Sequence, residues 1–310
     1  MIATVTLNPS LDEWIRLRSL RVGELNRATS FARYAGGKGI NVSRVLRELG
    51  IPTVAYAPVG GEDGSILQHL IRALHIPHVF VAVRGLTRNN YKIHTRRPRT
   101  FTEVNLPGPT VNARVLQNLE RRLLRQRVQC VAFCGSLPPG APASIYRRWI
   151  QRLKPRRIPA VLDASGDALR HGLLARPWMI KPNRREAEEL LGGRLTHRTA
   201  LVAAVKELLQ RGPDIVVLSL GKDGAVLGST ATSEIWRAKP PAVRTDSAVG
   251  SGDSLVAGFL AGWFRTRRVL EAFRLGVACG TAAAMTPGTE LCHRADIYRL
   301  LPRVLIKRID

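Results

Sequence analysis

The stretch 249–254 reads Val249-Gly250-Ser251-Gly252-Asp253-Ser254, and small and apolar residues follow it from Leu255 to Leu260. Glycines at a helix start let the backbone approach a ligand, and the unpaired N–H groups of the first turn can hold an anion. The pattern therefore predicts a helix with Asp253 in its first turn. A carboxylate beside an anion-binding loop suits phosphoryl transfer, because it can take a proton from an acceptor hydroxyl while the N–H groups hold the phosphate charge.

Two other phosphate-binding patterns are missing from the chain. The Gly-x-x-x-x-Gly-Lys-Ser/Thr string of the nucleoside triphosphatases does not occur, and neither does the His-Arg-Asp loop of protein kinases. The segment 37–42 has two glycines of a dinucleotide fingerprint, but Val42 replaces the third. The stretch 249–254 alone also fits a glycine turn before a buried helix, so the rest of the chain must decide between the two interpretations.

The chain has 310 residues, which suits one large α/β domain or two small ones. Apolar residues make up 45% of it, enough for a buried core. No apolar run reaches the length of a membrane span, and the opening MIATVTLNPS lacks a signal-peptide pattern. The four cysteines lack zinc-binding spacing. We therefore expect a cytoplasmic protein with free thiols and no membrane contact.

The net charge is +25, and arginine supplies most of the positive charge. It is concentrated in Arg84 to Arg99, Arg121 to Arg127 and Arg147 to Arg157. A nucleic-acid surface is one interpretation, but no recognition motif accompanies the charge, and aromatic residues are only 5% of the chain. A solvated, arginine-rich surface is favoured, and we expect no specific nucleic-acid partner. A positive field would still speed the capture of anionic ligands.

Strand-like and helix-like runs alternate along the chain. The strand-like runs are Ala3–Leu7, Thr53–Pro58, His78–Val83, Val128–Phe133, Ala160–Leu162, Met179–Ile180 and Ile215–Leu218. The helix-like runs are Asn41–Leu49, Ser65–Leu74, Ala113–Leu124, Pro142–Leu153, Arg184–Leu191 and Thr199–Leu209, and the part from Ser254 to Leu301 also reads as helical. This alternation predicts a doubly wound α/β fold, with a mostly parallel sheet flanked by helices on both faces.

Two further segments read as extended strands. The first is Asp12–Leu20, and the second, Asn90–Asn105, resembles a hairpin with its turn at Arg96-Arg97-Pro98-Arg99. A few strands cannot form a domain alone, so we expect one domain over residues 1–310 with a small β lid at about 12–34 and 88–106. Such a lid could cover the mouth of the main sheet or pair with another subunit.

Six further motifs stand in order along the chain. They are Thr6–Asp12, Ala35–Ser43, Thr87–Asn90, Gly135–Gly140, Lys181–Glu186, and Ser219–Gly221 with Gly224. Together with 249–254 they resemble the motifs of the ribokinase-like (PfkB) carbohydrate kinases. Within that family the chain resembles the branch of the 1-phosphofructokinases, the minor 6-phosphofructokinases and the tagatose-6-phosphate kinases. The resemblance runs from the first strand to the last helices and implies a ribokinase-like fold.

The resemblance implies a sugar site at the first two motifs. Asp12, just beyond the first strand, would bind sugar hydroxyls. Its position after Asn-Pro also fits an aspartate that caps a turn. Gly36 and Gly37 let a sugar lie against the backbone. Asn41 offers a donor and an acceptor, which suits a pair of hydroxyl groups; it could also be an ordinary residue of the first helical turn.

Lys38 and Arg88 are the candidates for holding a phosphate that the acceptor already carries, because cations pair with a dianion. Without its motif, Arg88 would read as one more surface arginine. The resemblance adds Asn90 and Ser136 to the substrate site. Two cations suit a phosphosugar better than a neutral sugar.

The resemblance places ATP against the later motifs, at Lys181, Asn183, Ser219, Gly221 and Gly224. It also implies that Asn183 and Glu186, spaced i, i+3 on one helical face, organise Mg²⁺ largely through water beside the ATP phosphates. The same pair resembles a helix capping box, and both roles can hold at once.

Asp253 is the predicted catalytic base, and Gly250, Ser251 and Gly252 are the predicted anion hole. An aspartate with an ordinary pKa is already ionised at neutral pH and needs no upward shift to accept a proton. Ser251 replaces the usual alanine of the family, and we expect its N–H to remain available. Ala248 replaces the family's threonine, which removes a hydroxyl.

Many relatives hold a potassium-type ion through backbone carbonyls beside this loop. The corresponding positions in this chain lie near Ser247, Val249 and Gly288. Carbonyl ligands do not depend on side-chain identity, so the resemblance implies a possible K⁺ site here.

The expected function is an ATP-dependent phosphosugar kinase that converts fructose 1-phosphate into fructose 1,6-bisphosphate. The alternatives are a 6-phosphofructokinase or a tagatose-6-phosphate kinase, each acting on a 1-hydroxyl, because the ketohexose is pseudo-symmetric. A basic nucleic-acid-binding protein and a kinase-like regulator are less favoured. The lid and the family analogy predict a homodimer.

Overall fold

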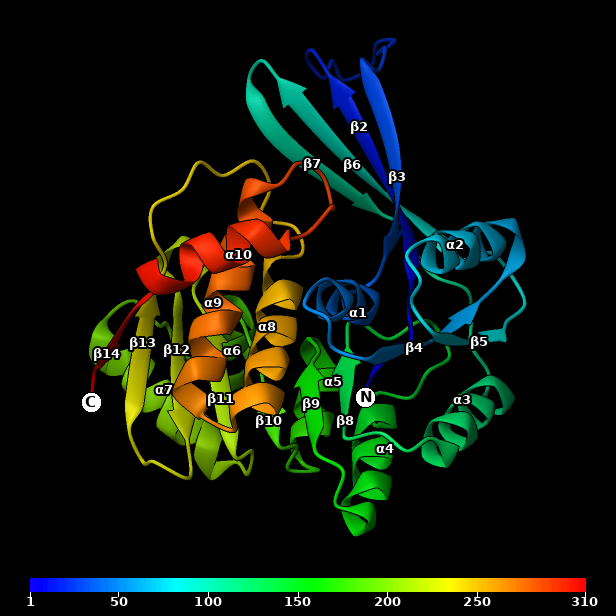
Figure 1. Ribbon diagram of the computed structural model, residues 1–310. Coiled ribbons are helices and arrows are strands. Elements are labelled where there is room, and N and C mark those ends of the chain that lie inside the picture. The colour runs from blue at the N-terminus through cyan, green and yellow to red at the C-terminus, as the bar shows by residue number, and fades with distance from the viewer.

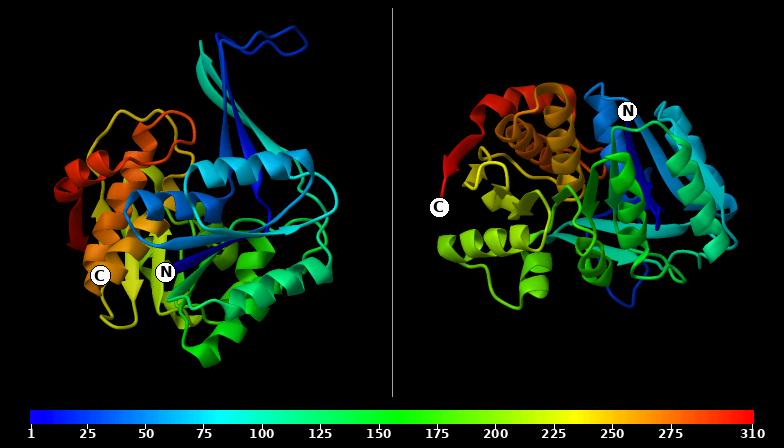
Figure 2. Two further views of the ribbon diagram at one scale, coloured as in Figure 1. Left: turned by 45° about the vertical axis from the view of Figure 1, so that its right-hand side comes forward. Right: turned by 90° about the horizontal axis from the view of Figure 1, so that it is seen from below.

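The computed structural model describes residues 1–310, apart from the side chain of Arg99. Its strands form a ten-stranded sheet and a separate four-stranded sheet. Figure 1 shows the four-stranded sheet projecting from one edge of a layered α/β body, and Figure 2 shows the same arrangement from two other sides. No helix among the described residues is long and apolar enough to cross a membrane.

The large sheet has the order β14-β13-β12-β11-β10-β9-β8-β1-β4-β5. Its parallel strands are β1 (Ile2–Thr6), β4 (Thr53–Val59), β5 (His78–Ala82), β8 (Cys130–Cys134), β9 (Ala160–Asp163), β10 (Met179–Ile180) and β11 (Ile215–Ser219). The antiparallel strands are β12 (Ala225–Ser229), β13 (Ile235–Lys239) and β14 (Leu305–Arg308). The predicted α/β class and the mostly parallel sheet are therefore confirmed, whereas the antiparallel edge was not predicted.

Helices cover both faces of this sheet. One face packs against α3 (Ala113–Arg125), α4 (Ile145–Leu153), α5 (Gly166–Leu173), α6 (Arg184–Leu191) and α7 (Arg198–Gln210). The other face packs against α1 (Lys38–Glu48), α2 (Gly61–Ala73), α8 (Ser251–Thr266), α9 (Val269–Met285) and α10 (Arg294–Leu300). Neighbouring residues of one strand face opposite layers, as the period of two requires: Val131 belongs to the first core and Ala132 to the second. Helix α5 was missed because its apolar run is short.

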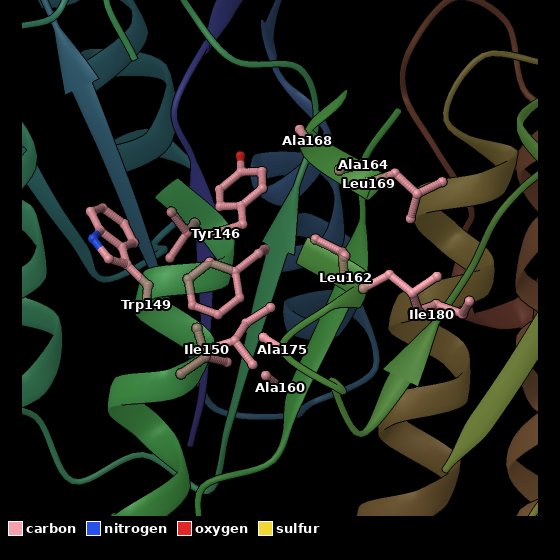
Figure 3. Close-up of a cluster of buried hydrophobic side chains, with 14 of the residues drawn as sticks. Tyr146, Trp149, Ile150, Ala160, Leu162, Ala164, Ala168, Leu169, Ala175 and Ile180 are labelled. Carbon is pink, nitrogen blue, oxygen red and sulfur yellow. The ribbon is translucent and has the colours of Figure 1, made fainter. Parts of the chain in front are cut away.

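The first core is built around aromatic side chains of α4 (Figure 3). The ring of Phe133 on β8 lies 5.5 Å from that of Tyr146 and 6.1 Å from that of Trp149. The Tyr146 hydroxyl donates to the carbonyl of Cys134 at 3.3 Å. This packing holds α4 against β8, and β8 pairs in parallel with β9, whose carboxyl end carries Asp163 into the site.

The small sheet has the order β3-β2-β6-β7, and we call it the lid. Its strands are β2 (Ser10–Leu17), β3 (Ser30–Gly36), β6 (Arg88–Arg96) and β7 (Arg99–Asn105). β2 pairs in parallel with β6, and β6 forms the expected hairpin with β7. No separate strand was predicted at β3. Asp12 lies beyond β1 and inside the lid strand β2, in agreement with the extended segment expected from Asp12 onward.

The C-terminal part is less continuous than predicted. The expected helical stretch from Ser254 to Leu301 is interrupted after α8, where Arg267 has a φ of 56°, and again over 286–293. Helices α8 and α9 lie side by side (Figure 1). A Cβ added at Gly280 would approach the Ser251 carbonyl to 2.9 Å. This close approach holds the start of α8 against α9, so glycine at 280 helps to fix the 249–254 loop.

Candidate functional site

A cavity of about 990 Å³ lies between the lid and the carboxyl ends of the parallel strands. Open α/β sheets bind ligands at this edge. Most of the site residues predicted from the sequence line the cavity: Asp12, Gly37, Lys38, Asn41, Arg88, Asn90, Ser136, Lys181, Asn183, Ser219, Gly221, Gly224, Gly250, Ser251, Gly252 and Asp253. The fold therefore brings all the predicted motifs to one place. Gly36 precedes the lining residue Gly37 in the chain, and Glu186 is bonded to the lining residue Asn183.

Asp253 is buried, with 6% of its surface exposed, in the first turn of α8. Its Oδ2 accepts a hydrogen bond of 2.8 Å from the side-chain amide of Asn41 on α1. Burial raises the pKa of Asp253 above its ordinary value; Lys38 and the Asn41 hydrogen bond oppose this shift, and Asp163 adds to it. The expectation of an ordinary pKa was wrong, because the sequence did not reveal how deeply the carboxylate lies.

Asp163, at the end of β9, is the principal site residue that the sequence analysis missed. It is fully buried, and its Oδ1 accepts from the ammonium groups of Lys38 at 3.0 Å and Lys181 at 3.2 Å. Its other oxygen, Oδ2, has no hydrogen-bond partner. A signal was present, since an aspartate directly follows the apolar strand residues 160–162 in the chain.

The two lysines decide the ionisation of this cluster. Burial opposes the charge on Asp163, but Lys181 and Lys38 outweigh it and hold the pKa of Asp163 below its ordinary value. Burial also opposes the charge on Lys38, yet Asp163 and Asp253 together raise the pKa of Lys38. The Lys38 side chain keeps 37% of its surface exposed, so it remains accessible from the cavity. The site therefore combines a fixed anion with cations that a phosphate can approach.

The loop before α8 has the geometry expected of an anion-binding turn, with one difference. Gly250 has a φ of 77°, and a Cβ there would lie 2.3 Å from a methyl group of Leu291. The Ser251 N–H was expected to be available, but it donates to the carbonyl of Ala248 at 3.3 Å. The N–H groups of Gly252 and Asp253 have no acceptor in the described part of the chain. They, rather than the Ser251 N–H, point to an anion hole.

The lid contributes a second buried cluster. The Asp12 carboxylate accepts from Ser10 Oγ at 3.0 Å, Asn90 Nδ2 at 3.2 Å and Lys92 Nζ at 2.8 Å. Lys92 was missed, because within a hairpin an alternating lysine reads as a solvated residue. Gly36 is explained by this cluster, since a Cβ there would lie 2.5 Å from Asp12 Oδ1.

The remaining acceptor-side residues have simpler surroundings. Arg88 donates to the Asn8 carbonyl at 3.1 Å, and burial lowers its pKa. Ser136 accepts a 3.2 Å hydrogen bond from the side-chain amide of Asn8. Gly37 has a φ of 111°, and a Cβ there would lie 2.7 Å from a methyl group of Thr6. Arg88 therefore lies on the lid, whereas Lys38 is bound to Asp163 in the body, so the two proposed phosphate-binding cations belong to different clusters.

The nucleotide-side motifs meet next to this body cluster. Asn183 caps α6, and with Glu186 it forms the capping box that the spacing indicated. A bridge between Asn183 and Ser219 places β10 and β11 ends side by side. Gly224 has a φ of 89°, and a Cβ there would lie 1.9 Å from the Ala238 carbonyl, so no other residue fits this turn.

The donor set suits a magnesium ion that keeps most of its water. Within the described residues, no group of three or more His, Cys, Asp or Glu side chains could hold a metal ion by itself. Glu186 uses Oε2 to accept the Asn183 N–H at 2.8 Å, which leaves Oε1 for a metal-bound water. Magnesium commonly binds through few carboxylates and the phosphates of its substrate, so these residues fit it.

Three backbone carbonyls lie where a monovalent cation was expected. Among the residues that the structure describes, the carbonyls of Ser247, Val249 and Gly288 accept no hydrogen bond. The Val249 N–H is turned toward Ser247 Oγ at 3.2 Å, and Gly288 lies against the ring of Tyr34. These carbonyls are therefore available as ligands for a hard cation.

Replacing Asp163 tests the body cluster. Asp163→Asn removes the charge that Lys38 and Lys181 share, and we expect the free energy of unfolding at pH 7 to fall by about 3–5 kcal/mol. Asp167→Asn, which removes an exposed partner of Arg170, should change it by less than about 0.5 kcal/mol. Urea unfolding measures both.

The pH dependence has a definite sign. Because the pKa of Asp163 is lower in the folded state, its contribution is complete above the unfolded value of about 3.9 and is lost as the pH falls through the folded pKa. The stability gap between wild type and Asp163→Asn should be constant from about pH 5 to 8 and narrow below about pH 4. A gap that widens on acidification would contradict this assignment.

Comparisons with known proteins agree with the geometry. The family described as pfkB family carbohydrate kinase matches residues 5–296. A 1-phosphofructokinase of Bacillus subtilis is 36% identical over 310 residues, 100% of each chain. An ATP-dependent 6-phosphofructokinase isozyme 2 of Mycobacterium tuberculosis is 34% identical over 303 residues, 96% of this chain and 88% of its own.

A solved structure supports the same relationship. Phosphofructokinase-2 of Escherichia coli, in complex with substrates and products, has a TM-score of 0.93 and 30% identity, covering 97% of this chain and 98% of its own. That protein has also been solved with potassium, with fructose-6-phosphate and as a tetrameric inhibited form. The chain therefore belongs to the PfkB family of carbohydrate kinases and is a phosphotransferase of the phosphofructokinase type.

Proposed function

We propose that the protein transfers the γ-phosphoryl group of ATP to the 6-hydroxyl of fructose 1-phosphate. The observation that carries this proposal is the position of Asp253, a buried carboxylate in a cavity with a polar lid on one side and the nucleotide motifs on the other. An acceptor held under the lid would present a hydroxyl to Asp253. ATP held at Asn183, Ser219, Gly221 and Gly224 would present its γ-phosphate to the same point.

Asp253 acts as the general base in this proposal. Oδ2 is already bonded to Asn41, so Oδ1 is the oxygen that accepts the hydroxyl proton. The hydroxyl oxygen forms a bond to the γ-phosphorus, the bond from that phosphorus to the β-γ bridging oxygen breaks, and ADP leaves. A raised pKa makes Asp253 a stronger proton acceptor than an exposed aspartate.

The charge that moves in this step is met by cations and N–H groups. Lys38 and Lys181, held by Asp163, supply positive charge to the transferring phosphoryl group. The N–H groups of Gly252 and Asp253 add hydrogen bonds to its oxygens. Lys38 is thus reassigned from the acceptor's phosphate to the transferred one, and Arg88 remains with the acceptor's phosphate.

A divalent cation fits beside this group. Asn183 and Glu186 would hold Mg²⁺ through water, and when bound the ion would supply charge neutralisation for the ATP phosphates. We also propose a K⁺ ion at the carbonyls of Ser247, Val249 and Gly288, which activity measured in potassium and in tetramethylammonium salts would test. The potassium complex of the Escherichia coli relative supports this site.

The choice of acceptor rests on the whole-length similarity to a 1-phosphofructokinase and on the segments 102–109 and 177–186, which resemble those of the 1-phosphofructokinases. The similarity to 6-phosphofructokinase isozyme 2 favours a second candidate, in which the 1-hydroxyl of fructose 6-phosphate or tagatose 6-phosphate is the acceptor. The segment 288–292, which resembles that of the minor 6-phosphofructokinases, favours the same candidate. We place the reaction in the cytoplasm, where four free, buried cysteines suit a reducing environment.

A panel of acceptors tests the substrate. We expect Mg²⁺-dependent ADP release with the highest kcat/KM for fructose 1-phosphate, above fructose 6-phosphate and tagatose 6-phosphate by about tenfold or more. A preference for either 6-phosphate would reverse the choice of acceptor but keep the phosphosugar kinase. Negligible release with all three would refute the proposed function.

Replacing the base tests the mechanism. Asp253→Asn should lower turnover by about 10²–10⁴-fold while nucleotide binding persists. The pKa of Asp253 is higher in the folded state, so ionised Asp253 costs stability at neutral pH, and the variant should melt at the same or a higher temperature. Asp296→Asn, which breaks a surface pair with Arg299, is the control. Near-normal turnover of Asp253→Asn would refute the assignment of Asp253 as the general base.

We further propose a homodimer that forms through the lid. Large apolar side chains are exposed on its outer face, with Phe31 57% and Val104 46% exposed, and a second lid would cover them. Light scattering should then give twice the 34.1 kDa of one chain. A monomer at micromolar concentration would refute the dimer.

A further inference from the structure

The lid presents one polar face to the cavity. Side chains at every second position of a strand share a face, and the lid residues that line the cavity follow this period: Ser10, Asp12, Arg88, Asn90, Lys92, Glu103 and Asn105. Four of them carry charge. Arg88 and Lys92 balance Asp12 and Glu103, so this inner face carries no net charge.

Lys92 is an unusual member of this face because it is buried. Only 5% of its surface is exposed, and its ammonium donates to Asp12 Oδ2 at 2.8 Å. Trp14 is its neighbour in register on β2; it stacks against His94 and packs at a tilt against Phe101, which closes off that end of the face. An ammonium has three N–H groups, and two of those on Lys92 have no acceptor among the described residues.

Asp12 has little capacity left for further donors. Its two oxygens already accept from Ser10, Asn90 and Lys92, out of roughly four lone-pair positions. By contrast, Asn90 Oδ1 is buried without a partner and can accept from a sugar hydroxyl. Lys92 is therefore both the counter-charge of Asp12 and a remaining donor on this face.

Glu103 lies directly opposite Lys92 in the β6–β7 ladder. Directly opposed residues have Cβ atoms about 4.5–5.5 Å apart, so their charges interact. Glu103 is exposed and forms no ion pair with any side chain that the structure describes. Without Lys92, Asp12 and Glu103 would outweigh Arg88, and the face would carry a net negative charge.

We propose that Lys92 determines the specificity of the acceptor site for phosphorylated sugars. This inference rests on the proposed function. A phosphosugar brings a charge of nearly −2, which a net negative face would repel. Lys92 cancels the charge of Asp12 while leaving that carboxylate in place, and its spare N–H groups attract the acceptor. It is a specificity-determining residue on the lid and takes no part in the proton transfer.

Charge-changing variants of the lid test this assignment. The measurement is the Kd of fructose 1-phosphate by calorimetry without ATP, alongside the KM for ATP. Lys92→Met should weaken sugar binding by about tenfold or more, since like charges then face the phosphate. Glu103→Gln should tighten it by at least about twofold, and the double variant should return to within about threefold of wild type.

Two controls separate charge balance from damage to the lid. Arg18→Met removes a cation from an exposed lid position that does not line the cavity, and it should leave the Kd unchanged. Lys92→Arg keeps the charge and should bind within about threefold of wild type. The KM for ATP should stay constant in every variant, because the lid lies away from the nucleotide motifs.

The outcomes that would overturn the inference are distinct. If Lys92 only held Asp12 in place, Glu103→Gln would not rescue Lys92→Met, and the double variant would bind as weakly as the single one. An unchanged Kd in Lys92→Met would also refute it. If Lys92→Met does not fold, Glu103→Gln at its exposed site still tests the inference. Fructose 1-phosphate binding to Glu103→Gln that is equal to or weaker than binding to wild type would contradict the proposed charge balance. A wild type that binds none of the three sugar phosphates refutes the proposed function itself.

Discussion

One buried carboxylate organises the body side of this site. Asp163 ends β9 with no exposed surface, and it holds Lys38 from α1 and Lys181 from the end of β10 on the same oxygen. An isolated charge in this position would be costly, and the pairing removes that cost. The consequence is a fixed pair of cations next to the start of α8. These cations offset the negative charge of Asp253, which would otherwise repel an approaching phosphate.

The lid contains a second buried ion pair, on the other side of the cavity. Asp12 and Lys92 join β2 to β6, and the hydrogen bonds that Asp12 accepts hold the lid side of the cavity in one arrangement. Asp253 lines the same cavity as residues of both clusters and is linked to α1 through Asn41. The site therefore depends on contacts between segments far apart in the chain. In each of these ion pairs and hydrogen bonds, the two partners come from different segments.

This division explains what the sequence could predict. The α/β class, the lid hairpin and the capping box at Asn183 and Glu186 follow from local patterns, and the structure has all three. Asp163 and Lys92 were missed because their roles depend on partners far along the chain: Lys38 lies 125 residues from Asp163, and Asp12 lies 80 residues from Lys92. The expectations for the pKa of Asp253 and for a free Ser251 N–H were wrong for a related reason, because burial and turn geometry are not visible in residue spacing.

The most direct test of this account is a crystal structure with fructose 1-phosphate, Mg²⁺ and a non-hydrolysable ATP analogue. The account predicts the 6-hydroxyl within about 2.6–3.2 Å of Asp253 Oδ1, the γ-phosphate beside Lys38 and Lys181, and the sugar phosphate at the lid near Arg88. A sugar bound in the opposite direction, with its phosphate against Asp253, would contradict it. So would a γ-phosphate bound away from the two lysines that Asp163 holds.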